Sequence, residues 1–274
     1  MSERLDAALA ARGLARSRTH AAGLIADGLV TVDGRPVVKS SAKVEESSLI
    51  EVAVFDHYVS RAAHKLVAAL DAFPIEVAGR GALDMGASTG GFTQVLRERG
   101  ADPVIAVDVG HGQMSDRIKD DAGVISVEGY NVRDMTPESL AAASGTELAP
   151  SLVTGDLSFI SLGLVLPAVR ATMDAAGDAV LLIKQQFEVG RTSVRGGLVT
   201  DPASRADAVA GVLWAAWDTG LGTHGVIASP LPGTHGNHEF VAWFRERDVA
   251  DEGADADAAN PTAWLALVNE LTQR

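Results

Sequence analysis

A short apolar run that breaks into a glycine-rich turn is the feature that most restricts how this chain can fold. Residues 81–93 read Gly-Ala-Leu-Asp-Met-Gly-Ala-Ser-Thr-Gly-Gly-Phe-Thr, which predicts a strand, a glycine loop and the first turn of a helix. Small residues let a ligand approach the main chain closely, and a helix start presents free backbone N–H groups to it. The segment therefore predicts a binding site for a small, polar, nucleotide-like ligand.

The spacing of this loop distinguishes between nucleotide ligands. A dinucleotide site has the pattern G-x-G-x-x-G, whereas here Asp84 precedes the first glycine in the pattern D-x-G-x-x-x-G-G. A carboxylate at this point is a poor neighbour for a pyrophosphate, but it suits a ligand that carries an ammonium and a sulfonium. We therefore expect S-adenosylmethionine rather than NAD, and a loop that serves only tight packing remains the alternative.

Polar residues at the ends of the following strands complete the predicted cofactor site. The second predicted strand, Pro103–Asp108, ends in a carboxylate suited to a ribose diol. The third ends near Glu128 and Asn131, and either would lie near an adenine edge, because such ligands bind at the carboxyl ends of parallel strands. The predicted cofactor-binding residues are Asp84, Gly86, Ala87, Ser88, Thr89, Gly90, Gly91, Phe92, Asp108, Glu128, Asn131 and Asp156.

Apolar strands alternate with helical segments over about 160 residues, which predicts a doubly wound parallel sheet. Further strands are expected at residues 151–156, 179–184, 225–230 and 238–244, and an amphipathic helix at 204–217. A helix is also expected from Ser60, which would cap it, to about Ala72. Residues 248–260 are rich in Ala and Asp and are expected to be flexible, and Pro261 starts a terminal helix.

The composition limits the class of protein. With 274 residues, 47% of them apolar, the chain can bury a substantial core and hold one domain with a smaller companion. The sequence contains no cysteine, which excludes disulfides, thiolate metal sites and a thiol nucleophile. Its first residues are charged, and no apolar run approaches the roughly 18 residues of a membrane span, so we expect a cytoplasmic protein.

The net charge of −13 is unevenly distributed. Residues 1–44 hold seven Lys or Arg and four Asp or Glu, so this part carries +3 and the rest of the chain carries −16. A basic lobe on an acidic body predicts a local contact with a polyanion, and a solvated helix face is the alternative.

The basic lobe has the pattern of a small folded module. Residues 4–12 and 17–28 have helical spacing, and residues 29–38 read as strand, Asp-Gly turn and strand. With the phrase A-x-x-L-I-x-x-G-x-V-x-V-D-G, the segment at about residues 3–60 resembles the RNA-binding module of ribosomal protein S4. That module presents arginines to phosphate and 2′-OH groups of structured RNA.

RNA contacts are expected from this module, from Arg61 and from a loop at residues 190–201. The loop at residues 190–201 is long enough to act as a lid or to contact RNA. The predicted RNA-binding residues are Arg4, Arg16, Arg18, His20, Arg35, Lys39, Arg61, Arg191 and Arg195.

Four charged residues at the ends of predicted elements face the same side: Lys65, Asp156, Lys184 and Glu239. An ammonium of pKa about 10.4 is no base at neutral pH. A neighbouring cation and partial burial lower the pKa of a lysine, and carboxylates orient its amine. The cluster therefore predicts a lysine that can take a proton from a hydroxyl.

Four motifs give the chain a specific family resemblance. They are Asp-Met-Gly-Ala-Ser-Thr-Gly-Gly-Phe at 84–92, Gly-Asp-Leu-Ser-Phe-Ile-Ser-Leu at 155–162, Leu-Ile-Lys-Gln-Gln-Phe-Glu at 182–188, and Ser-Pro-x-x-Gly-x-x-Gly-Asn-x-Glu at 229–239. Together they resemble the FtsJ/RrmJ-like ribose 2′-O-methyltransferases. With the S4-like module in front, the chain resembles the TlyA family, whose members are named hemolysins.

This resemblance implies an α/β fold, with a Rossmann-like methyltransferase domain around a mostly parallel seven-stranded sheet. The expected division is an S4-like domain at 1–59 with a linker at about 55–62, a methyltransferase domain at 60–248, and a flexible segment with a terminal helix at 249–274. It also implies S-adenosylmethionine as cofactor and 2′-O-methylation of cytidine in 16S and 23S rRNA of both ribosomal subunits. The family's catalytic set falls on Lys65, Asp156, Lys184 and Glu239, with Lys184 as the base or the residue that steers the 2′-OH.

Three other functions remain as alternatives. A membrane-lytic hemolysin needs a cationic amphipathic segment or an apolar span, and the sequence shows neither. A non-catalytic rRNA-binding assembly factor would keep the fold as a scaffold, but it has no need of all four charged residues. An NAD-linked enzyme is the third.

The histidines at 224, 235 and 238 lack the helical spacing of metal ligands, so we expect no metal.

Overall fold

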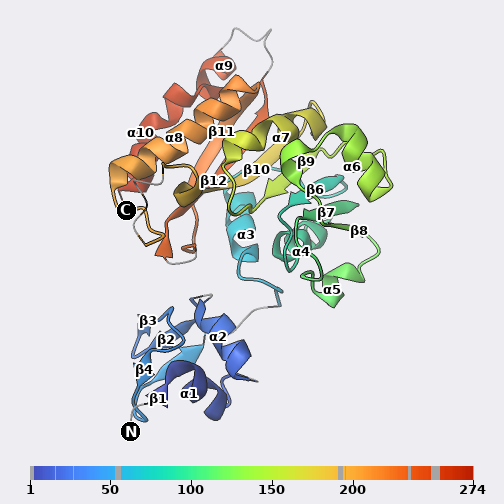
Figure 1. Cartoon of the computed structure of the whole chain (residues 1–274). Helices are drawn as coiled ribbons and strands as arrows, with labels where there is room; N and C mark the ends of the chain where they lie inside the picture. Colours follow the sequence, from blue (N-terminus) through green and yellow to red (C-terminus); the bar gives the residue numbers. More distant parts are fainter. Residues whose placement is uncertain are drawn as a thin grey trace. The chain divides into compact units, whose positions relative to one another are not determined.

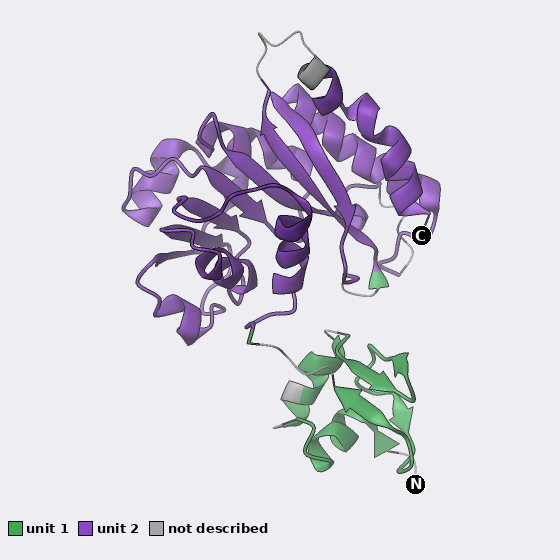
Figure 2. Ribbon diagram, turned by 180° about the vertical axis from the view of Figure 1, so that it is seen from behind, with its two compact units in different colours: residues 1–57, 234–236 green, residues 58–233, 237–274 purple. Residues whose placement is uncertain are grey.

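The computed structural model describes residues 3–15, 17–26, 28–52, 57–190, 194, 196–233, 236–247 and 254–273. The chain forms two compact units (Figure 2). Unit 1 comprises residues 1–57 and 234–236, and unit 2 comprises residues 58–233 and 237–274.

Unit 2 is built on a seven-stranded sheet, which confirms the predicted fold class (Figure 1). The strands are β6 (Ala82–Met85), β7 (Val104–Asp108), β8 (Val124–Glu128), β9 (Leu152–Gly155), β10 (Asp178–Lys184), β11 (Leu221–Ala228) and β12 (Glu239–Glu246). They lie in the order β11-β12-β10-β9-β6-β7-β8. β12 runs antiparallel to both of its neighbours, and the five strands from β10 to β8 are parallel.

Both faces of this sheet are covered because its strands are apolar on both sides. Along β6, Ala82 packs into one core and Leu83 and Met85 pack into the other, as the alternation of a strand requires. α3 (Ala63–Ala72) and α4 (Gly91–Glu98) supply the first core. α6 (Pro137–Ser144), α7 (Leu166–Thr172), α8 (Pro202–Asp218) and α10 (Pro261–Thr272) supply the second.

Two predictions about helices in unit 2 are corrected by the structure. The helix expected from Ser60 begins at Ala63, because residues 60–62 form a turn in which the Ser60 hydroxyl accepts the Ala62 N–H at 3.1 Å. Part of the segment expected to be flexible is helical, since α9 spans Ala254–Ala259. Alanine favours helix, and Ala259 is buried against Gly222 of β11. α10 begins at Pro261, as predicted.

Unit 1 contains the two helices and the hairpin that its sequence predicts. Its elements are β1 (Glu3–Arg4), α1 (Leu5–Ala11), α2 (Arg18–Ala26), β2 (Val30–Val32), β3 (Arg35–Pro36), β4 (Lys43–Val44) and β5 (Ile50–Val52). β2 lies between β3 and β5, and β1 pairs with β4. The turn between β2 and β3 has positive φ at Asp33 and Gly34, the backbone form that tight hairpins favour.

Among the described residues, no helix has the length and apolar character needed to cross a membrane.

Candidate active site

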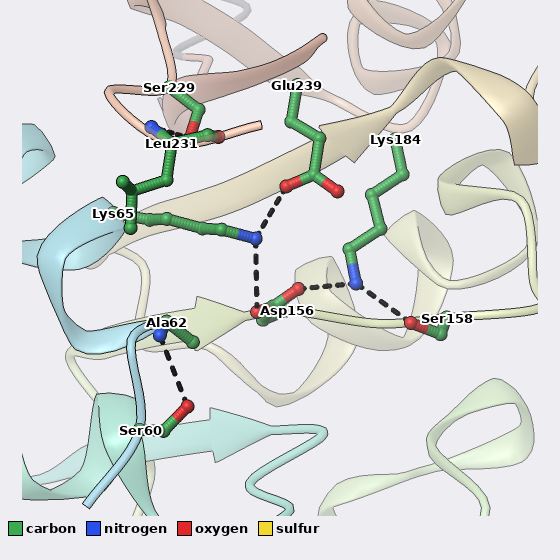
Figure 3. Close-up of polar contacts among 9 residues, drawn as sticks. All are labelled: Ser60, Ala62, Lys65, Asp156, Ser158, Lys184, Ser229, Leu231 and Glu239. Atoms are coloured by element: carbon green, nitrogen blue, oxygen red, sulfur yellow. Dashed lines mark hydrogen bonds and ion pairs between the residues drawn. The ribbon is translucent and has the colours of Figure 1, made fainter. Parts of the chain in front are cut away.

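The four predicted catalytic residues lie together at the carboxyl edge of the parallel strands. Asp156 follows β9, Lys184 ends β10, and Glu239 opens the antiparallel β12 directly opposite Lys184 in the register. Lys65 reaches the same place from the first turn of α3 (Figure 3). The antiparallel direction of β12 explains how a residue at a strand start meets residues at strand ends.

Lysines and carboxylates alternate in this cluster, as Figure 3 shows. Lys65 Nζ lies 2.5 Å from Glu239 Oε2 and 3.9 Å from Asp156 Oδ2. Lys184 Nζ lies 2.6 Å from Asp156 Oδ1 and donates a hydrogen bond of 2.8 Å to Ser158 Oγ. Each buried charge therefore has an opposite charge beside it, which is the condition under which ionised groups tolerate burial.

The four side chains differ in how much of each is exposed to solvent. The Lys65 and Glu239 side chains are 5% and 2% exposed, whereas those of Asp156 and Lys184 are 15% and 11% exposed. Asp156 and Lys184 also line a cavity, as described below. Lys65 and Glu239 are therefore the inner, more buried pair, and Asp156 and Lys184 are the outer pair that borders the cavity.

Two cavities meet at Asp156. The larger, about 520 Å³, is lined by Gly86, Ser88, Asp108, Val109, Gln113, Tyr130, Asn131, Val132, Asp156, Leu157, Ser158, Phe159 and Ile160. The smaller, about 190 Å³, is lined by Ser60, Ala62, Gly86, Ala87, Ser88, Thr89, Gly91, Phe92, Asp156, Ser158 and Lys184. The glycine loop of residues 86–91 contributes to both walls, so the predicted ligand loop and the charged cluster face the same space.

The backbone of the loop keeps this space open. Gly86 has a φ of 79°, and a Cβ at this position would lie 3.0 Å from the Asp156 carbonyl oxygen and from Leu157 Cδ2. Any larger residue would therefore push the loop against the segment that carries Asp156. A glycine is required here by both conformation and space.

Asp108 and Asn131 lie on the wall of the larger cavity, but Glu128 does not. The Asp108 carboxylate accepts the backbone N–H groups of Ser88 at 2.8 Å and Gly110 at 2.7 Å, which fixes it at the cavity edge. Glu128 lines only a small recess of about 10 Å³ beside Asp108. Of the two residues expected near an adenine edge, the structure therefore brings only Asn131 to this cavity.

Asp84 lies beneath the glycine loop and lines neither of the two cavities. It is fully buried, and its carboxylate accepts the hydroxyls of Thr93 at 2.6 Å and Thr154 at 3.2 Å. Burial, opposed by these two donors, raises the pKa of the Asp84 carboxyl to about 7.

Gly90 is also absent from the walls of both cavities, and its φ of 96° lies at the start of α4.

The burial of Asp84 predicts an unusual effect of the substitution Asp84→Asn on stability. Between about pH 4 and 7 the folded protein holds a proton that the unfolded chain releases, so the free energy of unfolding falls as pH rises through this window. Asn removes the ionisation, so we expect the Tm of the variant to exceed that of the wild type by at least about 3 °C at pH 8. At pH 4.5 the difference should be much smaller.

Thermal unfolding of both proteins at the two pH values, together with S-adenosylmethionine titration, checks this prediction. A variant that is less stable than the wild type at pH 8 would contradict the expected cost of ionising Asp84, and a variant that no longer binds the cofactor would show that binding needs the Asp84 carboxyl group.

Gly233 controls the position of Glu239. A Cβ at Gly233 would overlap the Glu239 carboxylate, and that carboxylate is held by Lys65. The Gly233 N–H donates to the Asn237 carbonyl at 2.8 Å, which ties Gly233 to the residue two positions before Glu239. If the site has the methyltransferase activity that the family resemblance implies, Gly233→Ala should lower its rate at least about tenfold by displacing Glu239.

The matched control is Gly211→Ala, because Gly211 lies within α8 with open space around its Cβ position. This control should retain full activity and gain slightly in Tm, since alanine favours helix. Rates in an RNA methylation assay compare the activities of the two variants, and thermal unfolding gives the Tm of the control. Equal activity of the two variants would contradict the role of Gly233.

The structure adds cavity residues that sequence reasoning missed. Gln113, Tyr130, Val132, Leu157, Ser158 and Phe159 all line the larger cavity. Ser158 also accepts from Lys184, and Phe159 is 91% exposed with a φ of 65°. The motif at 155–162 contains three of these residues, so its sequence was the available signal.

The predicted RNA-binding residues are distributed over both units. Arg4, Arg18, Arg35 and Lys39 are exposed on unit 1, and Arg61 is partly buried in unit 2. Arg16, Arg191 and Arg195 lie outside the described residues, as does the side chain of His20. Among the described residues, no group of three or more His, Asp or Glu could hold a metal ion.

A ligand loop after the first strand, a reactive cluster at the adjacent strand ends and an antiparallel β12 within an otherwise mostly parallel sheet place unit 2 among the Rossmann-like methyltransferases. One family model agrees with this class, and a second matches unit 1. The FtsJ-like methyltransferase model matches residues 58–246, and the S4 domain model matches residues 3–50.

Similarity to individual proteins identifies the family within this class. The chain is 48% identical over 245 residues to the 16S/23S rRNA (cytidine-2′-O)-methyltransferase TlyA of Mycobacterium tuberculosis, covering 88% of this chain and 89% of that protein. It is 36% identical over 242 residues to hemolysin A of Brachyspira hyodysenteriae, covering 88% and 99%. A solved structure of a proposed hemolysin from Streptococcus thermophilus has a TM-score of 0.73 and 33% identity, covering 99% and 97%. The chain therefore belongs to the FtsJ-like methyltransferase family, and within it to the S4-containing TlyA family.

Proposed function

We propose that this protein uses S-adenosylmethionine to methylate the 2′-OH of cytidine in 16S and 23S rRNA, in the cytoplasm. The observation that carries the proposal is the alternating cluster of Lys65, Asp156, Lys184 and Glu239 beside a cavity formed by the glycine loop. The name and 48% identity of the Mycobacterium tuberculosis relative support the substrate. Neither a scaffold nor a membrane-lytic protein needs this charge arrangement.

The residues of the larger cavity fit a nucleoside cofactor. Its volume of about 520 Å³ lies in the range of small-molecule sites. Val132, Leu157 and Ile160 offer apolar walls for a base, and the Asp108 carboxylate has free lone pairs for ribose hydroxyls. When bound, S-adenosylmethionine supplies a methyl group on a positively charged sulfur. The smaller cavity between the glycine loop and Lys184 is the place where this chain could bring a ribose to that methyl group.

The protein contributes position and proton transfer to the proposed reaction. Asp156 forms an ion pair with Lys184 and Ser158 accepts a hydrogen bond from it, which orients the Lys184 nitrogen and leaves a further position for a substrate hydroxyl. With its amine in the neutral form, after loss of one proton to water, Lys184 would steer the 2′-OH and take the hydroxyl proton; the cofactor would supply the methyl group, its bond to sulfur breaking as the bond to the ribose oxygen forms. Lys65 holds Asp156 and Glu239 in place, so the outer pair keeps a fixed geometry.

Phe159 is suited to hold the target base. Its ring is 91% exposed, lies at the larger cavity and packs against Phe187 with ring centroids 5.3 Å apart. Its left-handed backbone is strained for a non-glycine residue, which is a common property of ligand-contacting positions. An exposed aromatic face at the cavity that Ser158 also lines offers a stacking surface for a nucleobase.

We expect Phe159→Ala to lower kcat/KM for RNA about tenfold or more through loss of stacking. Phe159→Tyr keeps the ring and should retain most of the activity. Steady-state kinetics with an rRNA fragment separate the two variants, and a fully active alanine variant would rule out a stacking role.

The proposed function is tested with the purified protein, labelled S-adenosylmethionine, and 16S and 23S rRNA that lack the modification. Mass spectrometry of the digested RNA should show 2′-O-methylcytidine in both molecules. Mapping of 2′-O-methyl sites in cells with and without the protein gives the positions. Label on bases rather than ribose, or no label in either rRNA, would contradict the proposal.

A further inference from the structure

Unit 1 contains a group of basic side chains arranged around a buried carboxylate, and we propose that Asp6 positions Arg4 and Arg18 to bind the sugar-phosphate backbone of RNA. The proposal rests on the proposed function, since it states how unit 1 holds its RNA. Asp6 is itself negative, and its side chain is only 8% exposed, so it acts through the two arginines rather than by touching RNA.

Both carboxylate oxygens of Asp6 are used to hold the guanidinium groups. Arg4 donates from Nε to Oδ1 and from Nη2 to Oδ2, each at 3.0 Å. Arg18 donates from Nη2 to the same Oδ2 at 3.1 Å. Hydrogen bonds from Arg4 hold the pKa of Asp6 well below its ordinary value, so the carboxylate remains charged at neutral pH. One anion therefore fixes two cations side by side.

The arrangement leaves most of the arginine donors available. A guanidinium has five N–H donors, and Asp6 takes two from Arg4 and one from Arg18. The two side chains remain 43% and 61% exposed. Because one charge is shared by two arginines, the group keeps a net positive charge. A guanidinium that is already oriented loses less conformational entropy when it binds a phosphate.

Lys43 extends this basic group. It lies directly opposite Arg4 in the antiparallel pair β1–β4, and opposite residues in such a pair project from the same face. Lys43 is exposed. Two like charges at opposite positions repel each other, and the Asp6 carboxylate offsets this repulsion. The structure thus adds Lys43 to the residues expected to face RNA.

Arg12 shows the contrast with an arginine that serves the fold. Its guanidinium donates to the carbonyls of Ser48 at 2.7 Å and Glu45 at 2.9 Å, and it is 26% exposed. Carbonyl partners fix the chain between β4 and β5 and leave less of the group for a ligand. Arg4 and Arg18 are instead bound to a side chain that orients them at the surface.

The sign of one substitution tests the proposal. Removing a negative charge from an acidic protein should by itself strengthen attraction to RNA. We expect the opposite for Asp6→Asn, with the Kd for a 16S rRNA transcript rising about tenfold, as one charge-assisted contact is lost. The slope of log Kd against log salt concentration should fall by about one. Filter binding with the full-length protein over a range of KCl concentrations gives both quantities.

Glu46→Gln is the matched control, because it removes one negative charge from an exposed position of the same unit. Its Kd should stay equal to that of the wild type or fall slightly. Lys43→Gln should lower the salt slope by about one. Neither Glu46 nor Lys43 is buried, so both variants report on RNA binding even if Asp6→Asn weakens the fold.

A mutant cycle separates positioning from a general effect on folding. In a protein that already carries Arg4→Gln and Arg18→Gln, Asp6→Asn should have no further effect on the Kd, whereas a merely structural role would still weaken binding. A wild-type Kd for Asp6→Asn, with wild-type protein binding the transcript, would overturn this site alone. Absence of binding by the wild type would overturn the site together with the proposed RNA substrate.

Discussion

Replacing Lys184 by methionine is expected to lower the rate of methyl transfer about a thousandfold, because the side chain keeps its length and loses the nitrogen that would steer and deprotonate the 2′-OH. Lys184 lies beside Asp156 and Ser158 at the smaller cavity, so its loss leaves the walls of the larger cavity intact. Affinity for S-adenosylmethionine should therefore change little. Single-turnover methylation of rRNA and calorimetric titration of the cofactor measure the two effects.

The control for this variant is Lys119→Met, which removes an exposed lysine on the short helix α5 (Asp116–Lys119). It should keep wild-type activity. Undiminished ribose methylation by Lys184→Met would refute the catalytic role of this lysine. It would also favour the alternative of an rRNA-binding assembly factor that keeps the fold without the chemistry.

Replacing Glu239 by alanine should destabilise the protein by about 3–5 kcal/mol, since it leaves the buried Lys65 ammonium without its nearest partner. Asp156 lies 3.9 Å from Lys65 and compensates only partly. For a unit of this size the loss corresponds to a fall in Tm of roughly 10 °C or more. Activity should be lost as well, so this variant alone does not separate folding from catalysis.

The double variant Lys65→Met with Glu239→Leu makes that separation. Replacement of both partners of a buried ion pair by apolar side chains of similar size is often neutral or stabilising. We expect a Tm close to that of the wild type and no methylation. Thermal unfolding and methylation assays on the wild type, Glu239→Ala and the double variant distinguish loss of stability from loss of catalysis. Full activity of the double variant would mean that the inner pair has no part in positioning Asp156.

The sequence was most informative where a side chain ends a buried strand. Asp156 and Lys184 follow apolar runs, and the carboxyl ends of parallel strands meet at one edge, so their proximity could be predicted. Glu239 begins its strand, and Lys65 lies on a helix. Their place in the same cluster was predicted from positions at the ends of elements together with the family resemblance, because the start of a strand and a helix position do not by themselves indicate this edge of the sheet.

Other features depend on packing that the sequence does not display. Asp84 is adjacent to the ligand loop in sequence, but it faces the core, where Thr93 and Thr154 bind it. Phe159 is exposed and has a left-handed backbone, and its residue type predicts neither property. The role of Asp6 depends on two arginines at different distances along the chain, one of them at the start of α2.

The last strand of the sequence is not the last strand of the sheet. β12 lies between β10 and β11, so β11 has no sheet partner until the final strand of the chain has been made. The same strand brings Glu239, the last member of the cluster. During synthesis, strands β6 to β10 are made before β12, so the cluster of Lys65, Asp156 and Lys184 still lacks Glu239 at that stage. The pairing of β11 into the sheet and the completion of the four-residue cluster therefore depend on the same strand.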